Sequence, residues 1–320
     1  MKFYPLQFQP ILKDRIWGGT KLKSTLNKAI ASEITGESWE ISTVEHDVSV
    51  ISNGIFQGTN LNELINLFPI EVLGKSVYQQ FGTQFPLLFK FLDAKLDLSI
   101  QVHPNNDLAQ KRHQTFGKTE MWYVMQADAN AELIVGFKNN SSQQEYKNAL
   151  AQNALLSILQ KETVKQGDVF FLETGTVHAI GAGTLIAEIQ QTSDITYRIF
   201  DFDRIDSGGK KRELHNDLAL EAINYNKVDA KIEYHKKQNN STKLVHCDYF
   251  YTNIIDLKGE IDIENKYESF MVYMCVGGFL EFIQDDTIYS YTIGDTFLVP
   301  AAILNFKLSG EATLLEIFIK

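Results

Sequence analysis

The chain has 320 residues, of which 44% are hydrophobic and 22% charged, a composition that argues against a disordered protein. This length corresponds to about two domains with a sizeable core. Forty acidic residues against thirty basic ones give a net charge of −10, which argues against nucleic acid or an anionic membrane as the main partner.

The pattern of apolar residues predicts a mainly β chain with few helices. Helices are expected over 60–81, with interruptions at Pro69 and Gly74, and over 142–160 and 214–223. Short β-rich runs between turn residues lie at 121–125, 132–137, 169–172, 184–190, 270–276, 279–283, 296–299 and 313–318. Many short strands of this kind are typical of a β-sandwich or barrel.

A polar stretch at 235–243 is expected to be a loop, and we place a domain boundary there. The sequence then divides into domains 1–235 and 236–320. An internal repeat supports two related units, because 167–178 can be laid over 294–305. Each copy begins Gly-Asp, continues as an apolar strand and turns at small residues.

The first copy resembles the cupin pattern, in which a glycine, a proline, a second glycine and a histidine form a strand and its turn. It keeps Gly167, Gly175 and His178 but has Glu173 at the proline position, whereas the second copy has Asn305 in place of the histidine. The resemblance implies a bicupin, with two jelly-roll barrels, helices packed around the N-terminal one, and a C-terminal barrel without metal.

Four side chains form a candidate metal site. Residues two apart on a strand face the same side, so Gln101 and His103 are expected to point into the barrel together. Glu120 begins an aromatic strand and His178 ends the cupin turn. Two imidazoles, a carboxylate and an amide suit a catalytic Zn²⁺, although Mn²⁺ and Fe²⁺ also accept such ligands. Gln101 could instead hydrogen-bond a ligand from outside the metal shell.

A histidine on a strand is more often a hydrogen-bonded core or surface residue than a metal ligand. Only His103 and His178 stand at cupin positions. The remaining five have no such support and are expected to be structural or solvated: His46, His113, His215, His235 and His246.

Longer stretches resemble the type I mannose-6-phosphate isomerase family in its compact bacterial form. They span most of the chain from near residue 15 to near residue 225 and lie at 15–19, 36–42, 98–105, 117–123, 177–180 and 188–215. The resemblance implies an enzyme with one zinc ion per chain that interconverts mannose 6-phosphate and fructose 6-phosphate through an enediol. It also implies that the four side chains above hold the metal and that Arg198 is catalytic.

The chemistry of the reaction explains the residue types. Moving a proton between C2 and C1 of an aldose places negative charge on the sugar oxygens, which a metal and a guanidinium can stabilise. The phosphate needs charge-assisted donors, for which Ser99, Lys118 and Arg198 are the candidates. Arg198 could alternatively pair with Asp194 or Asp201 in a structural salt bridge.

Each of the remaining candidate residues has a second possible role. Lys118 follows a glycine in a turn, where lysines are usually solvated, but it shares a strand face with the metal ligand Glu120. Glu188 is the expected general base, with Glu40 as the alternative. Trp17 and Trp39 are expected in the core or at the rim of the site, and the basic run 210–212 in a solvated loop.

The two cysteines, Cys247 and Cys275, form neither a metal-binding spacing nor a disulfide framework, as is typical of a reducing compartment. No stretch has a signal core or the roughly 18 apolar residues of a membrane span. We therefore expect a cytoplasmic monomer or homodimer whose partner is a hexose 6-phosphate. The alternative functions are a metal-dependent cupin oxygenase and a sugar-binding bicupin without catalysis.

Overall fold

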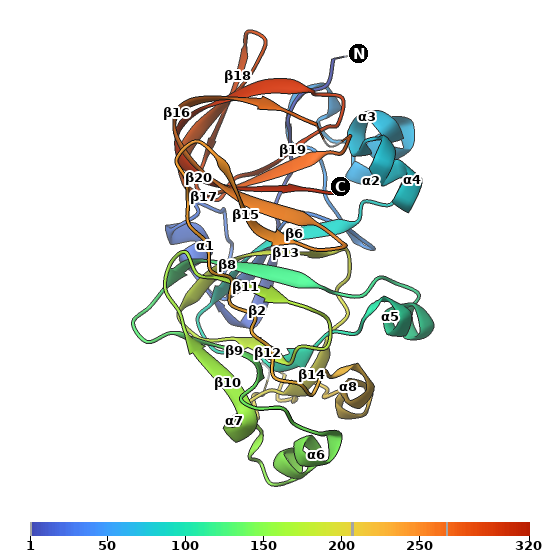
Figure 1. Cartoon of the computed structure of the whole chain (residues 1–320), viewed down its shortest axis with the longest axis vertical. Coiled ribbons are helices and arrows are strands. Elements are labelled where there is room, and N and C mark those ends of the chain that lie inside the picture. Colours follow the sequence, from blue (N-terminus) through green and yellow to red (C-terminus); the bar gives the residue numbers. More distant parts are fainter. Residues whose placement is uncertain (1, 206–207, 267) are drawn as a thin grey trace.

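The computed structural model describes residues 2–205, 208–266 and 268–320. It is mainly β, as predicted, and its strands pair antiparallel in three large sheets (Figure 1). Short helices lie at the periphery. Among the described residues, no helix is long and apolar enough to cross a membrane.

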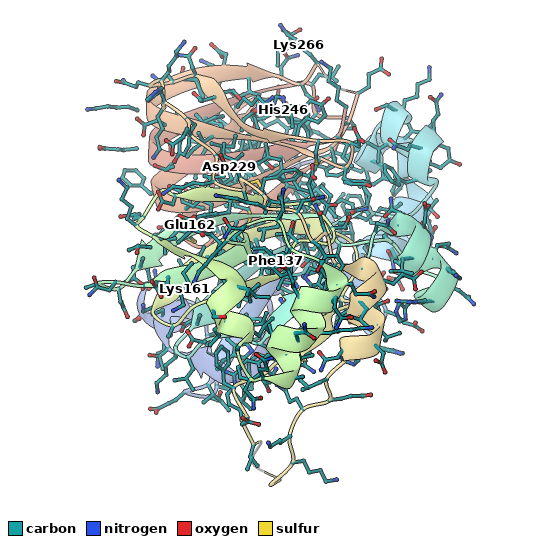
Figure 2. The ribbon with its side chains drawn as sticks, turned by 60° about the horizontal axis from the view of Figure 1, so that its bottom comes forward. Phe137, Lys161, Glu162, Asp229, His246 and Lys266 are labelled. Carbon is teal, nitrogen blue, oxygen red and sulfur yellow. The ribbon has the colours of Figure 1, made fainter. Side chains whose placement is uncertain are left out.

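Two of the sheets belong to the N-terminal part of the chain. The six-stranded sheet contains, in spatial order, β11 (Val169–Leu172), β8 (Glu120–Ala127), β13 (Thr184–Gln191), β6 (Leu87–Ala94), β3 (Thr35–Ile41) and β2 (Ile11–Gly19). The five-stranded sheet contains β10 (Leu159–Thr163), β9 (Glu132–Phe137), β12 (His178–Ile180), β7 (Ile100–Val102) and β14 (Tyr197–Phe200). Figure 2 labels Phe137, Lys161 and Glu162 on this second sheet.

The third sheet is formed mainly by the last third of the chain and is orange to red in Figure 1. Its path runs β1 (Leu6–Gln7), β19 (Thr296–Val299), β17 (Met271–Gln284), β20 (Asn305–Phe318), β16 (Tyr251–Glu264) and β15 (Ser241–His246), with β18 (Thr287–Thr292) paired to β17. Because β1 pairs with β19, the N-terminal strand joins the C-terminal sheet. A two-stranded ribbon joins β4 (Thr43–Val44) to β5 (Asp47–Val48).

Side chains alternate along the strands of the six-stranded sheet, so its two faces pack against different sheets. Met121 and Tyr123 belong to the core shared with the C-terminal sheet, where the ring of Phe85 lies 4.8 Å from that of Phe270. Trp122, one position along, packs in the core shared with the five-stranded sheet. Polar side chains on this second face therefore point between the two N-terminal sheets.

The helix predicted over 60–81 is divided at the two predicted interruptions into α2 (Leu61–Leu67), α3 (Pro69–Leu73) and α4 (Lys75–Phe81). Pro69 takes the first position of α3, where its missing N–H costs nothing. Gly74 separates α3 from α4 with φ of +91°, a conformation that favours glycine. The other two predicted regions contain α6 (Gln143–Ala151), α7 (Leu155–Ile158) and α8 (Asn216–Ala222).

Several boundaries predicted from the sequence were wrong. Residues 159 and 160 start β10 instead of ending a helix, and residues 241–243 belong to β15 instead of a loop. The runs 270–276 and 279–283 form one strand, β17, which continues through a register shift between Cys275 and Gly277. A bulge lets a strand bend without ending, so the glycines here mark a bulge and not a turn.

Two short helices and one 3₁₀ turn were not predicted: α1 (Lys21–Ser24), α5 (Asn106–His113) and the turn Gly54–Phe56. Only Leu108 and Ala109 of α5 are buried. A helix with so small an apolar face leaves no helical periodicity in the sequence.

Candidate metal centre and active site

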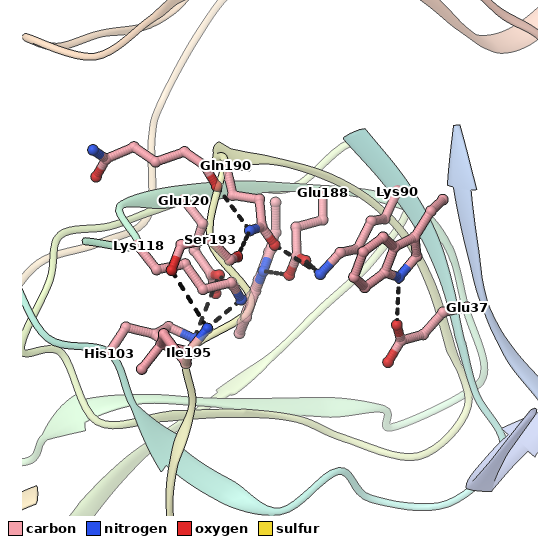
Figure 3. A network of polar contacts seen from close by, with 12 residues as sticks. Glu37, Lys90, His103, Lys118, Glu120, Glu188, Gln190, Ser193 and Ile195 are labelled. Atoms are coloured by element: carbon pink, nitrogen blue, oxygen red, sulfur yellow. Dashed lines mark hydrogen bonds and ion pairs between the residues drawn. The ribbon is translucent and has the colours of Figure 1, made fainter. Parts of the chain in front are cut away.

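Three of the four predicted metal ligands converge between the two N-terminal sheets, and Figure 3 labels two of them, His103 and Glu120. The potential ligand atoms of His103, Glu120 and His178 all lie within 4.8 Å of one another, and all three residues are buried. The Nε2 atoms of His103 and His178 lie 3.5 and 3.4 Å from the two carboxylate oxygens of Glu120. His178 opens β12, Glu120 opens β8 and His103 follows β7, so three strand ends build the cluster.

Backbone carbonyls orient both imidazoles. His103 Nδ1 lies 2.9 Å from the carbonyl oxygen of Ile195, and His178 Nδ1 lies 2.8 Å from that of Thr176. A carbonyl only accepts, so each Nδ1 carries the proton and each Nε2 presents a lone pair to the cluster. Burial lowers the pKa of His178 to about 4 and that of His103 well below its usual value, so both rings are neutral at pH 7 and able to bind a metal.

Glu120 supplies the carboxyl group of the cluster. Its Oε2 accepts a hydrogen bond of 2.7 Å from Lys118 Nζ, whereas its buried Oε1 has no hydrogen-bond partner. Burial, opposed by the charge of Lys118, raises the pKa of Glu120 to about 7. A buried carboxylate oxygen without a donor is costly, and here two imidazole lone pairs face the same point. The donor set therefore fits a divalent cation.

Gln101 lies beside this cluster. It pairs with His178 across β7 and β12, and its Nε2 atom lies 3.3 Å from His178 Nε2. Rotation of the amide would turn its oxygen toward the same point. The structure thus brings the amide of Gln101 to the edge of the cluster.

Lys118 is buried in the cluster and is not solvated. Its Nζ lies 3.2 Å from His103 Nε2 in addition to its contact with Glu120. Burial alone would lower the pKa of Lys118, but Glu120 and Glu188 outweigh burial and raise it. The ammonium group therefore stays charged beside the cluster.

Glu188 faces the same space from the centre of β13 (Figure 3). Its Oε2 accepts a 2.9 Å hydrogen bond from the Trp122 indole, and its Oε1 lies 3.2 Å from Lys90 Nζ. Burial would raise the pKa of Glu188, but the charges of Lys118 and Lys90 outweigh burial and lower it to about 2. Glu188 is therefore an ionised carboxylate. Glu40, the alternative base, instead pairs with Lys28 at 2.7 Å and does not line the cavity described next.

A cavity of about 530 Å³ adjoins this cluster through Gln101 and Lys118, which line the cavity and contact His178 and Glu120. Its size accommodates a small polar ligand. Ser99, Gln101, Lys118, Glu188 and Arg198 line it, and so do both tryptophans expected in the core or at the rim. The sequence did not assign the following cavity-lining residues to the site: Lys13, Arg15, Glu37, Lys90 and Arg212.

Arg198 lies on β14, opposite Gln101. Its Nη1 donates to the carbonyl oxygen of Glu213 at 2.8 Å, and its buried Nε has no hydrogen-bond partner. Among the residues that the structure describes, Arg198 has no ion pair with Asp194 or Asp201. Burial and the neighbouring Arg212 lower the pKa of Arg198. An arginine with an unused donor in a cavity is suited to an anionic ligand.

Two cavity residues show what the sequence could not indicate. Arg212 was expected in a solvated loop, but its side chain is 22% exposed and pairs with Asp201; the carboxylate that holds it lies eleven residues away. Lys90 donates to Gln190 Oε1 at 2.8 Å. Its only signal in the sequence is a charge between Phe89 and Phe91, in a strand whose eight residues are all buried.

Together, the fold and the site define a mainly β protein in which a buried cluster that could hold a metal ion lies beside a basic cavity. Two family models match the chain: the phosphomannose isomerase type I catalytic domain over residues 6–149 and the mannose-6-phosphate isomerase cupin domain over residues 240–319. The chain belongs to the type I mannose-6-phosphate isomerase family, which confirms the resemblance seen in the sequence.

Individual relatives cover nearly the whole chain. It is 36% identical over 313 residues to mannose-6-phosphate isomerase ManA of Bacillus subtilis, covering 96% of each chain. It is 35% identical to mannose-6-phosphate isomerase of Streptococcus mutans, covering 97% of each. The crystal structure of the mannose 6-phosphate isomerase from Bacillus subtilis matches with a TM-score of 0.90 and 34% identity, over 98% of this chain and 99% of that one.

Proposed function

We propose that this protein is a zinc-dependent isomerase that interconverts mannose 6-phosphate and fructose 6-phosphate through an enediol. One observation carries the proposal beyond family membership. The buried cluster of His103, Glu120 and His178 lies directly behind Gln101 and Lys118, two residues that line a cavity with Arg198 and Arg212 in its walls. A metal beside the cavity and cations in its walls suit a phosphorylated sugar that becomes more negative as it reacts.

His103, Glu120, His178 and Gln101 would hold the zinc ion. When bound, zinc supplies Lewis acidity toward the sugar oxygens. The nitrogen and oxygen donors, without thiolates, are typical of a catalytic zinc site with an open position. The lone pairs of both histidines and the unpartnered oxygen of Glu120 support this assignment.

The other assigned residues bind the substrate and move the proton. Arg198, with its unused Nε donor, and the buried hydroxyl of Ser99 would bind the anionic substrate. Lys118 would stabilise negative charge that develops on the sugar oxygens near the metal. Glu188 is ionised and faces the cavity, so we assign it the transfer of the proton between C2 and C1.

We further propose that the chain is a cytoplasmic bicupin. Residues 1–235 would form the catalytic domain, to which β1 is an exception because it pairs with the C-terminal sheet. Residues 236–320 would form a metal-free cupin domain. The cupin-domain match over 240–319 and the asparagine at position 305, where the first repeat has His178, support this division.

Metal removal tests the proposed function. Protein treated with a chelator should lose the formation of fructose 6-phosphate from mannose 6-phosphate, and added Zn²⁺ should restore it. Metal analysis of the same samples should give one zinc ion per active chain. Full activity in metal-free protein would refute the role of zinc. Oxygen consumption without isomerisation would favour a cupin oxygenase, and sugar binding without turnover a non-catalytic bicupin.

A further inference from the structure

The C-terminal sheet repeats the topology of the sheet that carries the active site. The strand order β3-β6-β13-β8-β11 corresponds to β15-β16-β20-β17-β19, with the same succession along the chain. One row of paired residues in the first sheet is Trp39, Lys90, Glu188, Trp122 and Phe170. The corresponding row in the second is Lys243, Asn253, Glu316, Tyr273 and Phe297.

Glu316 therefore occupies the position of Glu188, and its surroundings are similar on one side. The Tyr273 hydroxyl donates to Glu316 Oε1 at 3.0 Å, as the Trp122 indole donates to Glu188 Oε2. On the other side the two sites differ. Asn253 Nδ2 donates to Glu316 Oε2 at 2.9 Å, where Lys90 supplies an ammonium group to Glu188. An amide has replaced the cation.

The carboxylate of Glu316 has hydrogen bonds but no opposite charge. The residue is 4% exposed, and the Ser241 hydroxyl is its third donor. In the part of the chain that the structure describes, no lysine, arginine or histidine forms an ion pair with it. Buried carboxylates are normally paired with a cation because desolvation of the charge is costly. Three donors leave one of about four lone-pair positions free.

Neighbouring groups keep this arrangement in place. His246, labelled in Figure 2, lies on β15, and its Nε2 is 2.8 Å from Asn253 Oδ1. This contact turns the amide nitrogen of Asn253 toward Glu316. Burial lowers the pKa of His246, so the ring is neutral at pH 7 and does not supply the missing charge.

Glu316 and Ser241 line a cavity of about 790 Å³. Apolar wall is supplied by Ile263, Met271, Ile283 and Phe306. Two lysines also line the cavity, but Lys307 pairs with Glu260 at 2.6 Å and Lys266 with Glu264 at 2.9 Å. Both cations are therefore already neutralised, which makes the cavity a poor site for a phosphate.

The residues at the positions of the metal ligands also differ. Met271 pairs with Val299 as Glu120 pairs with Leu172, and Asn305 stands where the first repeat has His178. A thioether and an amide do not form a site for Zn²⁺. What remains is the buried carboxylate of Glu316 in a cavity whose lining combines four apolar residues with the further carboxylates of Asp262, Glu264 and Asp285.

We propose that this cavity is a second small-molecule site, which binds a primary amine whose ammonium group contacts Glu316 as Lys90 contacts Glu188. Hydroxyl groups on the ligand would meet Ser241 and Asn305, and its carbon skeleton would lie against Phe306. An amino sugar combines these features. The site is separate from the active site and needs no metal.

Calorimetric titration with glucosamine and glucose tests the proposal, because the two sugars differ only in the amine. We expect glucosamine to bind the full-length protein at least about tenfold more tightly than glucose, as for a charge-assisted contact. Glu316→Gln should weaken glucosamine binding by a similar factor. Asn253→Lys supplies an internal ammonium group and should have the same effect. Glu311→Gln, an exposed change on the same strand, should not alter it.

Circular dichroism and isomerase activity should be measured for every variant, because the proposed site lies outside the catalytic cluster and both should match wild type. If Glu316→Gln fails to fold, Asn253→Lys decides the question, since it satisfies the carboxylate. Equal affinity for the two sugars, absence of glucosamine binding at millimolar concentrations, or unchanged binding in Asn253→Lys would overturn the proposal.

Discussion

Lys90 and Glu188 form an ion pair whose removal should destabilise the protein measurably. The side chains are 7% and 5% exposed, and the atoms lie 3.2 Å apart. Exposed pairs contribute about 0–1 kcal/mol, but breaking a buried pair costs about 3–5 kcal/mol because it leaves an uncompensated charge. We therefore expect Lys90→Met to lower the free energy of unfolding by about 3 kcal/mol. This value is at the low end of the range because the pair lines a cavity and the charge of Lys118 still acts on Glu188.

The double variant Lys90→Met/Glu188→Gln is the matched control, because it removes both charges. Urea denaturation of the metal-free protein at pH 7 should show that the double variant is more stable than Lys90→Met alone. The interaction energy from the complete cycle should exceed about 1 kcal/mol. Additive effects of the two substitutions would show that the contact contributes nothing and would refute this reasoning.

The same ion pair should make the stability of the protein depend on pH in the acidic range. The pKa of Glu188 is lowered from its ordinary 4.5 to about 2, so the unfolded chain takes up this proton first as the pH falls. The contribution to stability is complete above about pH 4.5 and is lost as the pH falls toward 2. Lys90→Met should reduce this loss, because it removes one of the charges that lower the pKa. Denaturation midpoints measured across this range would detect the change.

Three further predictions concern the metal, catalysis and a helix cap. His178→Ala should lose bound metal in elemental analysis, whereas Asn305→Ala should keep it; equal loss in both would contradict a metal-free C-terminal domain. Arg198→Ala should retain metal but show kcat reduced at least about a hundredfold, as for other groups that stabilise developing charge, and near-normal turnover would exclude a catalytic role. Asn60→Ala removes the capping box with Glu63 and should cost about 1 kcal/mol of stability by thermal denaturation, with unchanged kcat.

Much of the candidate site could be predicted because its chemistry is local in the sequence. His103 and His178 stand in motifs, and Lys118 lies two residues before Glu120, the first residue of β8. The cations that complete the cavity could not be found this way. Lys90 is a single cation in a largely apolar strand. Arg212 is part of a basic run, and its partner Asp201 is brought to it only by folding.

The internal repeat likewise was detected only in part from the sequence. Sequence comparison aligned 167–178 with 294–305, because glycines and apolar residues follow each other at the same spacing. It did not align Glu188 with Glu316, since the strands that carry them differ in length and in sequence. Strand pairing places both carboxylates in the same row, and this correspondence follows from hydrogen-bond register alone.

The amino-acid sequence by itself determined the mainly β character, the interruptions of the helical region and the family, because strand alternation, proline and glycine geometry and short motifs act over a few residues. Tertiary structure decided which charges meet. Burial and pairing across sheets set the ionisation of Glu120 and Glu188, and they leave Glu316 without a cation. These properties depend on the distance between side chains far apart in the chain, which no local pattern encodes.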